Sequence, residues 1–203
     1  VANDGATQHT GYLIKKGMWD AYKCVSTSTG NSYPEITTLL KQQQQAGALI
    51  MDYAGHGRAD QISHERVLTL SDFEKFSNTN LPLWVTASCD ILPFDGVEPT
   101  IGEAAVTNSK GGAVAFFGTT RTVYSNYNKS INMAFMRYVL SAPDGKPITF
   151  GEAQRLAKNQ MITNKQDTTV NKLQYSLLGD PAIALHLPTL SIVVDSINGV
   201  CPS

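Results

Sequence analysis

Short apolar runs alternate with amphipathic stretches along most of this 203-residue chain, and no other feature constrains its fold as strongly. Three of the runs are typical of buried strands: Ala48–Ala54, Leu83–Ser88 and Ala113–Phe117. Buried strands separated by helical patterns indicate parallel strands joined by crossover helices. The sequence therefore predicts an α/β fold in which helices flank a mostly parallel sheet.

The stretches around these strands carry the boundary signals of helices. Pro34 suits the first turn of a helix over Pro34–Ala46, and Gly47 suits its C-terminal cap. Capping boxes are expected where Ser71 precedes Glu74, Thr100 precedes Glu103 and Thr149 precedes Glu152, the last two opening helices to about Asn108 and Ile162. The remaining expected elements are helices over Lys129–Leu140 and Val170–Leu178, a turn at Pro143–Gly145, and short strands over Tyr22–Ser26, Ile183–Leu187 and Leu190–Val194.

Composition narrows the function before any motif is considered. The net charge is -1 and no basic stripe occurs, which argues against nucleic acid as a partner. No apolar run approaches the roughly 20 residues of a membrane span. Charged residues make up 16% of the chain, against about 25% in typical soluble domains. The resulting polar but weakly charged surface suits an exported protein.

One domain accounts for nearly the whole chain. No sequence repeat or linker calls for a second one, so residues 1–195 are expected to fold together. The chain opens abruptly at Val1–Gly5, which resembles the end of a strand entering a turn, so an upstream part is expected to be missing. Residues 196–203 are expected to be a tail or the start of a following module.

His56 and Cys89 directly follow two consecutive predicted strands. Loops at the carboxyl ends of parallel strands converge on one edge of the sheet, where ligands of open α/β sheets bind. A cysteine attacks as the thiolate, which a neighbouring imidazole favours, and the imidazole can then pass a proton to a leaving amine. The pair therefore predicts acyl transfer by a cysteine nucleophile.

Gly57 adds to this chemistry, because it has no side chain to obstruct a substrate carbonyl. Its N–H and that of Cys89 are candidates for the oxyanion hole. Taken singly, a cysteine at a strand end is usually a small buried apolar residue, and a histidine between glycines is often a turn residue. The other cysteines and histidines are less well placed: Cys24 on a predicted strand, Cys201 in the tail, and His9, His64 and His186 in loops or beside a proline.

Several motifs occur in a fixed order along the chain. They are Asp52–Gly57 (DYAGHG), Trp84–Asp90 (WVTASCD), Gly102-Glu103, Gly111–Gly118 (GGAVAFFG) and Leu177–Pro181 (LLGDP). The ordered set, from about Tyr22 to Leu187, resembles the gingipain family of clan CD cysteine peptidases. The resemblance implies a caspase-like three-layer α/β sandwich. It also implies His56 as general acid/base, Cys89 as nucleophile, and the N–H groups of Gly57 and Cys89 as oxyanion hole.

Within that family, the stretch Thr119–Ser125 (TTRTVYS) is similar to PorU-type sortases of the type IX secretion system. The similarity implies a cysteine endopeptidase that removes C-terminal sorting signals from exported cargo through a thioacyl-enzyme. The acyl group would pass to water or to a lipopolysaccharide amine, so transpeptidation is included. Secretion-system components would be partners, and the protein would lie at the bacterial cell surface, associated with the outer membrane, or outside the cell. The residues implied to line the substrate cleft are Thr119, Thr120, Arg121 and Tyr124.

Two alternatives stay open from the sequence: a general secreted gingipain-like protease, and a catalytically silent binding module of the same fold. The presence of both His56 and Cys89 argues against the silent module. Family members carry an upstream acidic residue that orients the histidine, and Asp4 is either its remnant or part of a simple Asp-Gly turn. No cofactor is required by this chemistry. A structural calcium ion remains an option because some gingipains bind one, although no compact acidic loop marks a site.

Overall fold

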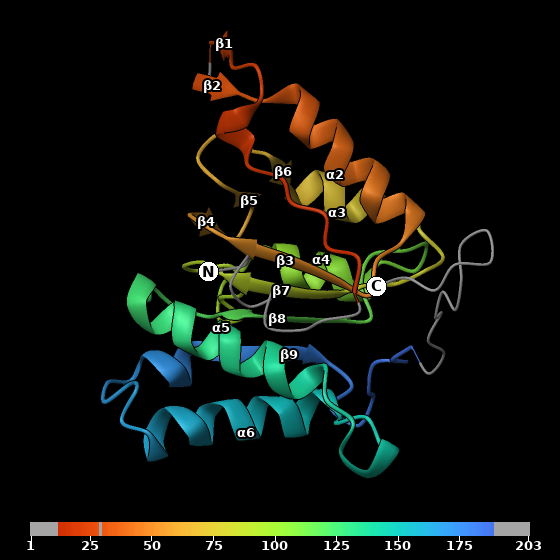
Figure 1. The fold of residues 1–203 in the computed structure, drawn as a ribbon. Helices are drawn as coiled ribbons and strands as arrows, with labels where there is room; N and C mark the ends of the chain where they lie inside the picture. Colours follow the sequence, from red (N-terminus) through yellow and green to blue (C-terminus); the bar gives the residue numbers. More distant parts are fainter. Residues whose placement is uncertain (1–11, 29, 189–203) are drawn as a thin grey trace, which may run out of the picture.

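The computed structural model describes residues 12–28 and 30–188, in which a four-stranded sheet lies between helical layers (Figure 1). The strand order is β3-β7-β8-β9, formed by Ile50–Ala54, Leu83–Ala87, Ala115–Thr119 and Tyr175–Gly179. The first three strands run parallel, and β9 pairs antiparallel with β8. The expected α/β fold with a mostly parallel sheet is confirmed.

Helices cover both faces of this sheet (Figure 1). One face carries α2 (Pro34–Ala46), α3 (Leu70–Lys75) and α4 (Ile101–Thr107), and the other carries α5 (Ser125–Val139) and α6 (Phe150–Thr163). Because side chains alternate along a strand, Trp84 packs on the α3–α4 side while its neighbour Val85 packs on the α5–α6 side. The sheet therefore has two separate hydrophobic cores, one for each helical layer.

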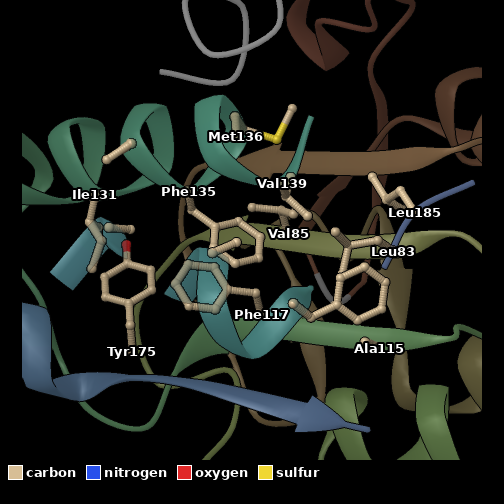
Figure 2. Packing of buried hydrophobic residues seen from close by; sticks show 14 of the residues in the cluster. Leu83, Val85, Ala115, Phe117, Ile131, Phe135, Met136, Val139, Tyr175 and Leu185 are labelled. Carbon is tan, nitrogen blue, oxygen red and sulfur yellow. The ribbon is translucent and has the colours of Figure 1, made fainter. Parts of the chain in front are cut away.

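The core under α5 is built on aromatic rings (Figure 2). Phe117 of β8 stacks on Phe135 of α5 with ring centroids 3.9 Å apart, and Tyr175 of β9 lies 5.2 Å from Phe117. All three side chains are fully buried, and burying one such ring stabilises a fold by roughly 1.5–3 kcal/mol. Cys89 packs against the same cluster. The end of β7 thus rests on a densely packed layer.

The capping box expected at Thr100 is confirmed, whereas at Thr149 only one of the two hydrogen bonds of a box forms. The Thr100 N–H donates to Glu103 Oε2 at 2.8 Å, and the Glu152 N–H donates to Thr149 Oγ1 at 3.3 Å. The box expected at Ser71 instead begins two residues earlier, where the Thr69 N–H donates to Asp72 Oδ2 at 2.8 Å. A short strand, β6 (Leu68–Thr69), runs directly into α3 and sets this earlier start.

The prediction of a helix over Val170–Leu178 is wrong. The chain forms a 3₁₀ turn, η3 (Asn171–Gln174), and then enters strand β9, all five residues of which pair with β8. This pairing buries Tyr175 on the α5 side and places Leu178 against the other core. Tertiary pairing therefore overrides the helical spacing of the apolar residues.

The remaining differences are local. A single bridge from Thr149 to Ala184 replaces the strand expected over Ile183–Leu187, while Leu190–Val194 lies outside the described residues. Helix α5 begins four residues before the expected Lys129. The strand expected over Tyr22–Ser26 instead begins at Val25, as β1 (Val25–Thr27), and pairs with β2 (Gly30–Ser32) in a hairpin. The other small elements are η1 (Trp19–Ala21), β4 (Gly57–Arg58), β5 (Gln61–Ile62) and η2 (Pro143–Gly145).

Candidate active site

The register between β3 and β7 brings His56 and Cys89 to the same edge of the sheet. The two strands pair in parallel, with Ala54 opposite Ala87, and the Gly55 N–H extends the pairing to the Ala87 carbonyl at 3.3 Å. His56 and Cys89 each lie two residues beyond that last pair. Since neighbouring strands are about 4.8 Å apart, both residues leave the sheet at the same level on adjacent strands.

Gly57 shows how closely the two loops approach each other. A Cβ atom added to Gly57 would lie 2.2 Å from Ser88 Oγ and 2.6 Å from Ile91 Cδ1, on either side of Cys89 in the sequence. Both distances are shorter than van der Waals contact. The loop that carries His56 therefore packs directly on the loop that carries Cys89, and any side chain at position 57 would force the Ser88 and Ile91 side chains to shift.

Replacing Gly57 with alanine is expected to push the two loops apart. Overpacking of this kind costs about 1–3 kcal/mol of stability, and a shift of about 1 Å between reacting groups costs about 10²-fold in rate. The kcat of the Gly57→Ala variant, measured with its thermal midpoint, checks this. Gly96→Ala is the matched control, because a Cβ there would meet atoms only at 3.8 Å and beyond. Equal activity of the two variants would contradict the close approach.

The loop after Cys89 is held by the segment that follows β8. The Thr119 hydroxyl donates to the Ser88 carbonyl, and the Asp90 N–H donates to the Arg121 carbonyl at 3.3 Å. Cys89 itself is half-buried, with its Sγ 3.5 Å from the Val123 carbonyl oxygen that it faces. Asp90 has a φ of 48°, a left-handed conformation that non-glycine residues adopt where the surrounding structure enforces it. The nucleophile candidate is thus fixed in position from both sides.

The backbone of His56 is fixed at its carbonyl, while its side chain is exposed. The carbonyl oxygen accepts hydrogen bonds from the Tyr53 hydroxyl at 2.7 Å and from the Ser63 N–H at 2.8 Å. The imidazole lies against that of His64, with ring centroids 4.8 Å apart. Sequence reasoning placed His64 in an unremarkable loop. The sequence does not reveal the hairpin of β4 and β5, which brings the chain back beside His56.

The two predicted oxyanion donors have suitable surroundings. Gly57 lies opposite Ile62 in the β4–β5 hairpin, next to the hydrogen-bonded pair of His56 and Ser63. Because bonded and non-bonded pairs alternate in an antiparallel ladder, the Gly57 N–H points away from the hairpin. Within the described part of the chain, no acceptor is assigned to the Cys89 N–H. Their role in binding an oxyanion remains a prediction.

The four residues expected to line a cleft fall into two groups. Thr119 is fully buried in β8, and Thr120 is buried with its hydroxyl donating to the Gln174 carbonyl at 3.1 Å. These two side chains anchor the loop, and as placed they are not available to touch a substrate. Arg121 and Tyr124 are exposed beside the Cys89 loop, Arg121 in an ion pair with Asp95 at 2.5 Å. They are the ones able to meet a substrate.

A buried carboxyl group lies near this site and was missed at the sequence level, although Asp52 belongs to the DYAGHG motif. Its Oδ1 accepts a hydrogen bond from Asn132 Nδ2 at 3.0 Å, while its Oδ2 is buried without a partner. Burial raises the pKa of Asp52 to about 6, against the lowering effect of the Asn132 hydrogen bond. The pKa of the buried Tyr175 is also raised, by burial first and then by the nearby Cys89 and Asp52.

Neither a metal centre nor a membrane span is found in the described residues. Across 12–28 and 30–188, no three His, Cys, Asp or Glu side chains gather where they could hold a metal ion. In the same ranges, no helix is both long and apolar enough to cross a bilayer. Cys24 is exposed and free, whereas Asp4, His9 and Cys201 lie outside the described residues.

Comparison with known proteins places these features in context. The model of peptidase family C25 matches residues 2–186. The Arg-specific cysteine proteinase gingipain R is similar in structure, with a TM-score of 0.60 and 18% identity over 73% of this chain and 36% of that chain. The complex of the pro- and mature domains of RgpB from Porphyromonas gingivalis gives a TM-score of 0.63 and 16% identity over 73% and 37%. The TM-scores establish a common fold, and at identities this low the similarity extends to the fold alone. No curated protein matches the sequence.

Proposed function

Because this chain belongs to peptidase family C25, we propose that it is a cysteine peptidase in which Cys89 attacks the substrate and His56 is the general acid/base. The observation that carries the proposal is the register of β3 and β7, which delivers the two residues to one edge of the sheet. The chain spans little more than a third of the gingipain chains it matches. We therefore propose the peptidase activity of the whole protein rather than taking it from this match.

The proposed reaction has two steps. The Cys89 thiolate attacks the scissile carbonyl carbon, and the N–H groups of Gly57 and Cys89 stabilise the oxyanion. His56, as imidazolium, gives its proton to the leaving amine, which leaves an acyl group on sulfur. The neutral imidazole then takes a proton from water or from an acceptor amine, which attacks the thioester and restores the thiolate. The exposure of the His56 side chain leaves its imidazole accessible to substrate and acceptor.

More specifically, we propose that the peptidase is a sortase, which acts on C-terminal sorting signals of exported proteins at the bacterial cell surface. The similarity of Thr119–Ser125 to PorU-type sortases supports it. Exposed Tyr124 beside the Cys89 loop offers an aromatic ring to an extended substrate, and the neighbouring Arg121 is exposed in its ion pair with Asp95. A sortase would use an amine, such as one on lipopolysaccharide, as acceptor. A general secreted protease would use water alone.

A peptide assay with the full-length protein separates these outcomes. The substrate is a peptide that spans the junction between cargo and sorting signal, incubated with and without an added primary amine. We expect a single cleavage and, with the amine, an amide-linked product of matching mass, both absent in Cys89→Ala. Cleavage at many sites of casein without an amine product would replace the sortase role with that of a general protease. Binding of the peptide without cleavage of either substrate would contradict the proposed peptidase activity.

A further inference from the structure

We propose that His64 is a positioning residue for His56, whose ring it holds in the working orientation. The inference rests on the catalytic role proposed for His56. The two imidazole rings are in contact, with centroids 4.8 Å apart and planes inclined by 45°. Both side chains are exposed, so no surrounding core forces them together. Their contact is a local feature of the loop that follows β3.

The backbone explains why the rings meet. In the β4–β5 hairpin Gly57 lies opposite Ile62, so His56 lies opposite Ser63, and the Ser63 N–H donates to the His56 carbonyl at 2.8 Å. His64 is the next residue along the chain. Its distance from His56 is therefore set by a hydrogen-bonded hairpin rather than by a flexible loop.

Ser63 adds a second constraint. It is 2% exposed and has a φ of 64°, in the left-handed region that residues other than glycine seldom adopt. Its carbonyl accepts a hydrogen bond from Gln61 Nε2 at 2.8 Å, which locks this conformation. The chain direction changes at Ser63, and His64 departs from the line of β5 beside His56. Unusual backbone geometry of this kind clusters at functional sites.

His56 has no other orienting partner within residues 12–28 and 30–188. In these ranges its ring has no hydrogen bond to a carboxylate or to any other side chain, and His64 is the one aromatic residue whose ring it contacts. Histidine bases are ordinarily held by a third group, since a free side chain spreads over about three χ1 wells. On this proposal the His64 ring excludes some of these wells and holds His56 in the orientation that it uses with Cys89.

Three variants test the inference. His64→Ala should lower kcat by about three- to tenfold with little change in KM, because His56 then samples all three wells. His64→Phe keeps a ring at the contact and should retain kcat within about twofold of the wild type. His186→Ala is the control. His186 is exposed like His64, but it lies at the opposite edge of the sheet from His56. There it lines a hollow with Leu49, Leu81 and Val114, which come just before the starts of β3, β7 and β8.

The chemical shifts of the His56 ring protons supply a readout independent of activity. The ring current of a neighbour should shift them in the wild type and in His64→Phe, and the shift should vanish in His64→Ala. Wild-type kcat in His64→Ala, or an equal loss in the Phe and Ala variants, would overturn the positioning role. Failure of the catalytic proposal looks different, because His56→Ala would then remain active.

Discussion

Cys89→Ala is expected to abolish cleavage of peptide substrates, and His56→Ala to lower kcat by about 10²–10⁴-fold, the usual contribution of a general acid/base. In the proposed mechanism Cys89 provides the sulfur to which the acyl group is bound, and alanine has no atom to take its place. His56 is proposed to provide the proton for the leaving amine. Steady-state kinetics on a fluorogenic peptide, with mass spectrometry to detect the thioacyl intermediate, checks both losses.

The same variants should keep the native fold. His56 is exposed, and a loop side chain contributes little packing. Cys89 is half-buried, and truncation to alanine removes only its sulfur. Thermal midpoints near that of the wild type are therefore expected, and Cys24→Ala, at an exposed free thiol, is the control for loss of a cysteine. Global unfolding of His56→Ala would instead give this histidine a structural role.

Asp52→Asn is expected to stabilise the protein at alkaline pH. In the folded chain Asp52 Oδ2 is buried without a hydrogen-bond partner, so an ionised carboxylate there is unfavourable. An asparagine side chain of the same shape carries no charge and can still accept the hydrogen bond that Asn132 now donates to Asp52. Urea unfolding of both proteins between pH 4 and pH 8 measures the difference.

The direction follows from the pKa of Asp52, which folding raises from 3.8 to about 6. The folded state holds the proton more tightly, so the stabilising contribution of protonated Asp52 is complete below the unfolded pKa. It is lost as pH rises from about 4 to about 6 and stays lost above. We compare the free energy of unfolding of Asp52→Asn with that of the wild type at each pH. At about 1.4 kcal/mol per pKa unit, the gain from the substitution should be up to about 3 kcal/mol larger at pH 8 than at pH 4.

Asp60→Asn is the matched control for this experiment. The hydrogen bond from Arg58 lowers the pKa of the more exposed Asp60, so its replacement should give a small effect of opposite sign. An Asp52→Asn difference that does not grow with pH would show that Asp52 is ionised and solvated in the folded protein.

The sequence predicted the parts of the fold that depend on local patterns. Apolar runs such as Leu83–Ala87, in which Thr86 is the one polar residue, are typical of strands buried on both faces, and Pro34 with Gly47 marks both ends of α2. The placement of His56 and Cys89 at one edge of the sheet was predicted because parallel strands end at a common edge. That rule needs strand order and direction alone.

The missed features depend on contacts between distant segments. Strand β9 exists because Tyr175–Gly179 can pair with β8, which no local spacing reveals. Thr119 was taken for a substrate contact, yet it is buried because β8 extends two residues past Phe117. The role proposed for His64 depends on a hairpin whose turn lacks the glycine or asparagine that predicts one.

The most direct test of the His56–Cys89 pair is the rate at which iodoacetamide alkylates each cysteine at pH 6, resolved by mass spectrometry. Cys24 is an exposed thiol in the same molecule and serves as the internal reference. We predict that Cys89, although more buried, reacts faster than Cys24, and that His56→Ala removes this advantage because the imidazolium no longer stabilises the thiolate. Slower alkylation of Cys89 than of Cys24, unchanged by His56→Ala, would contradict the pairing of the two residues.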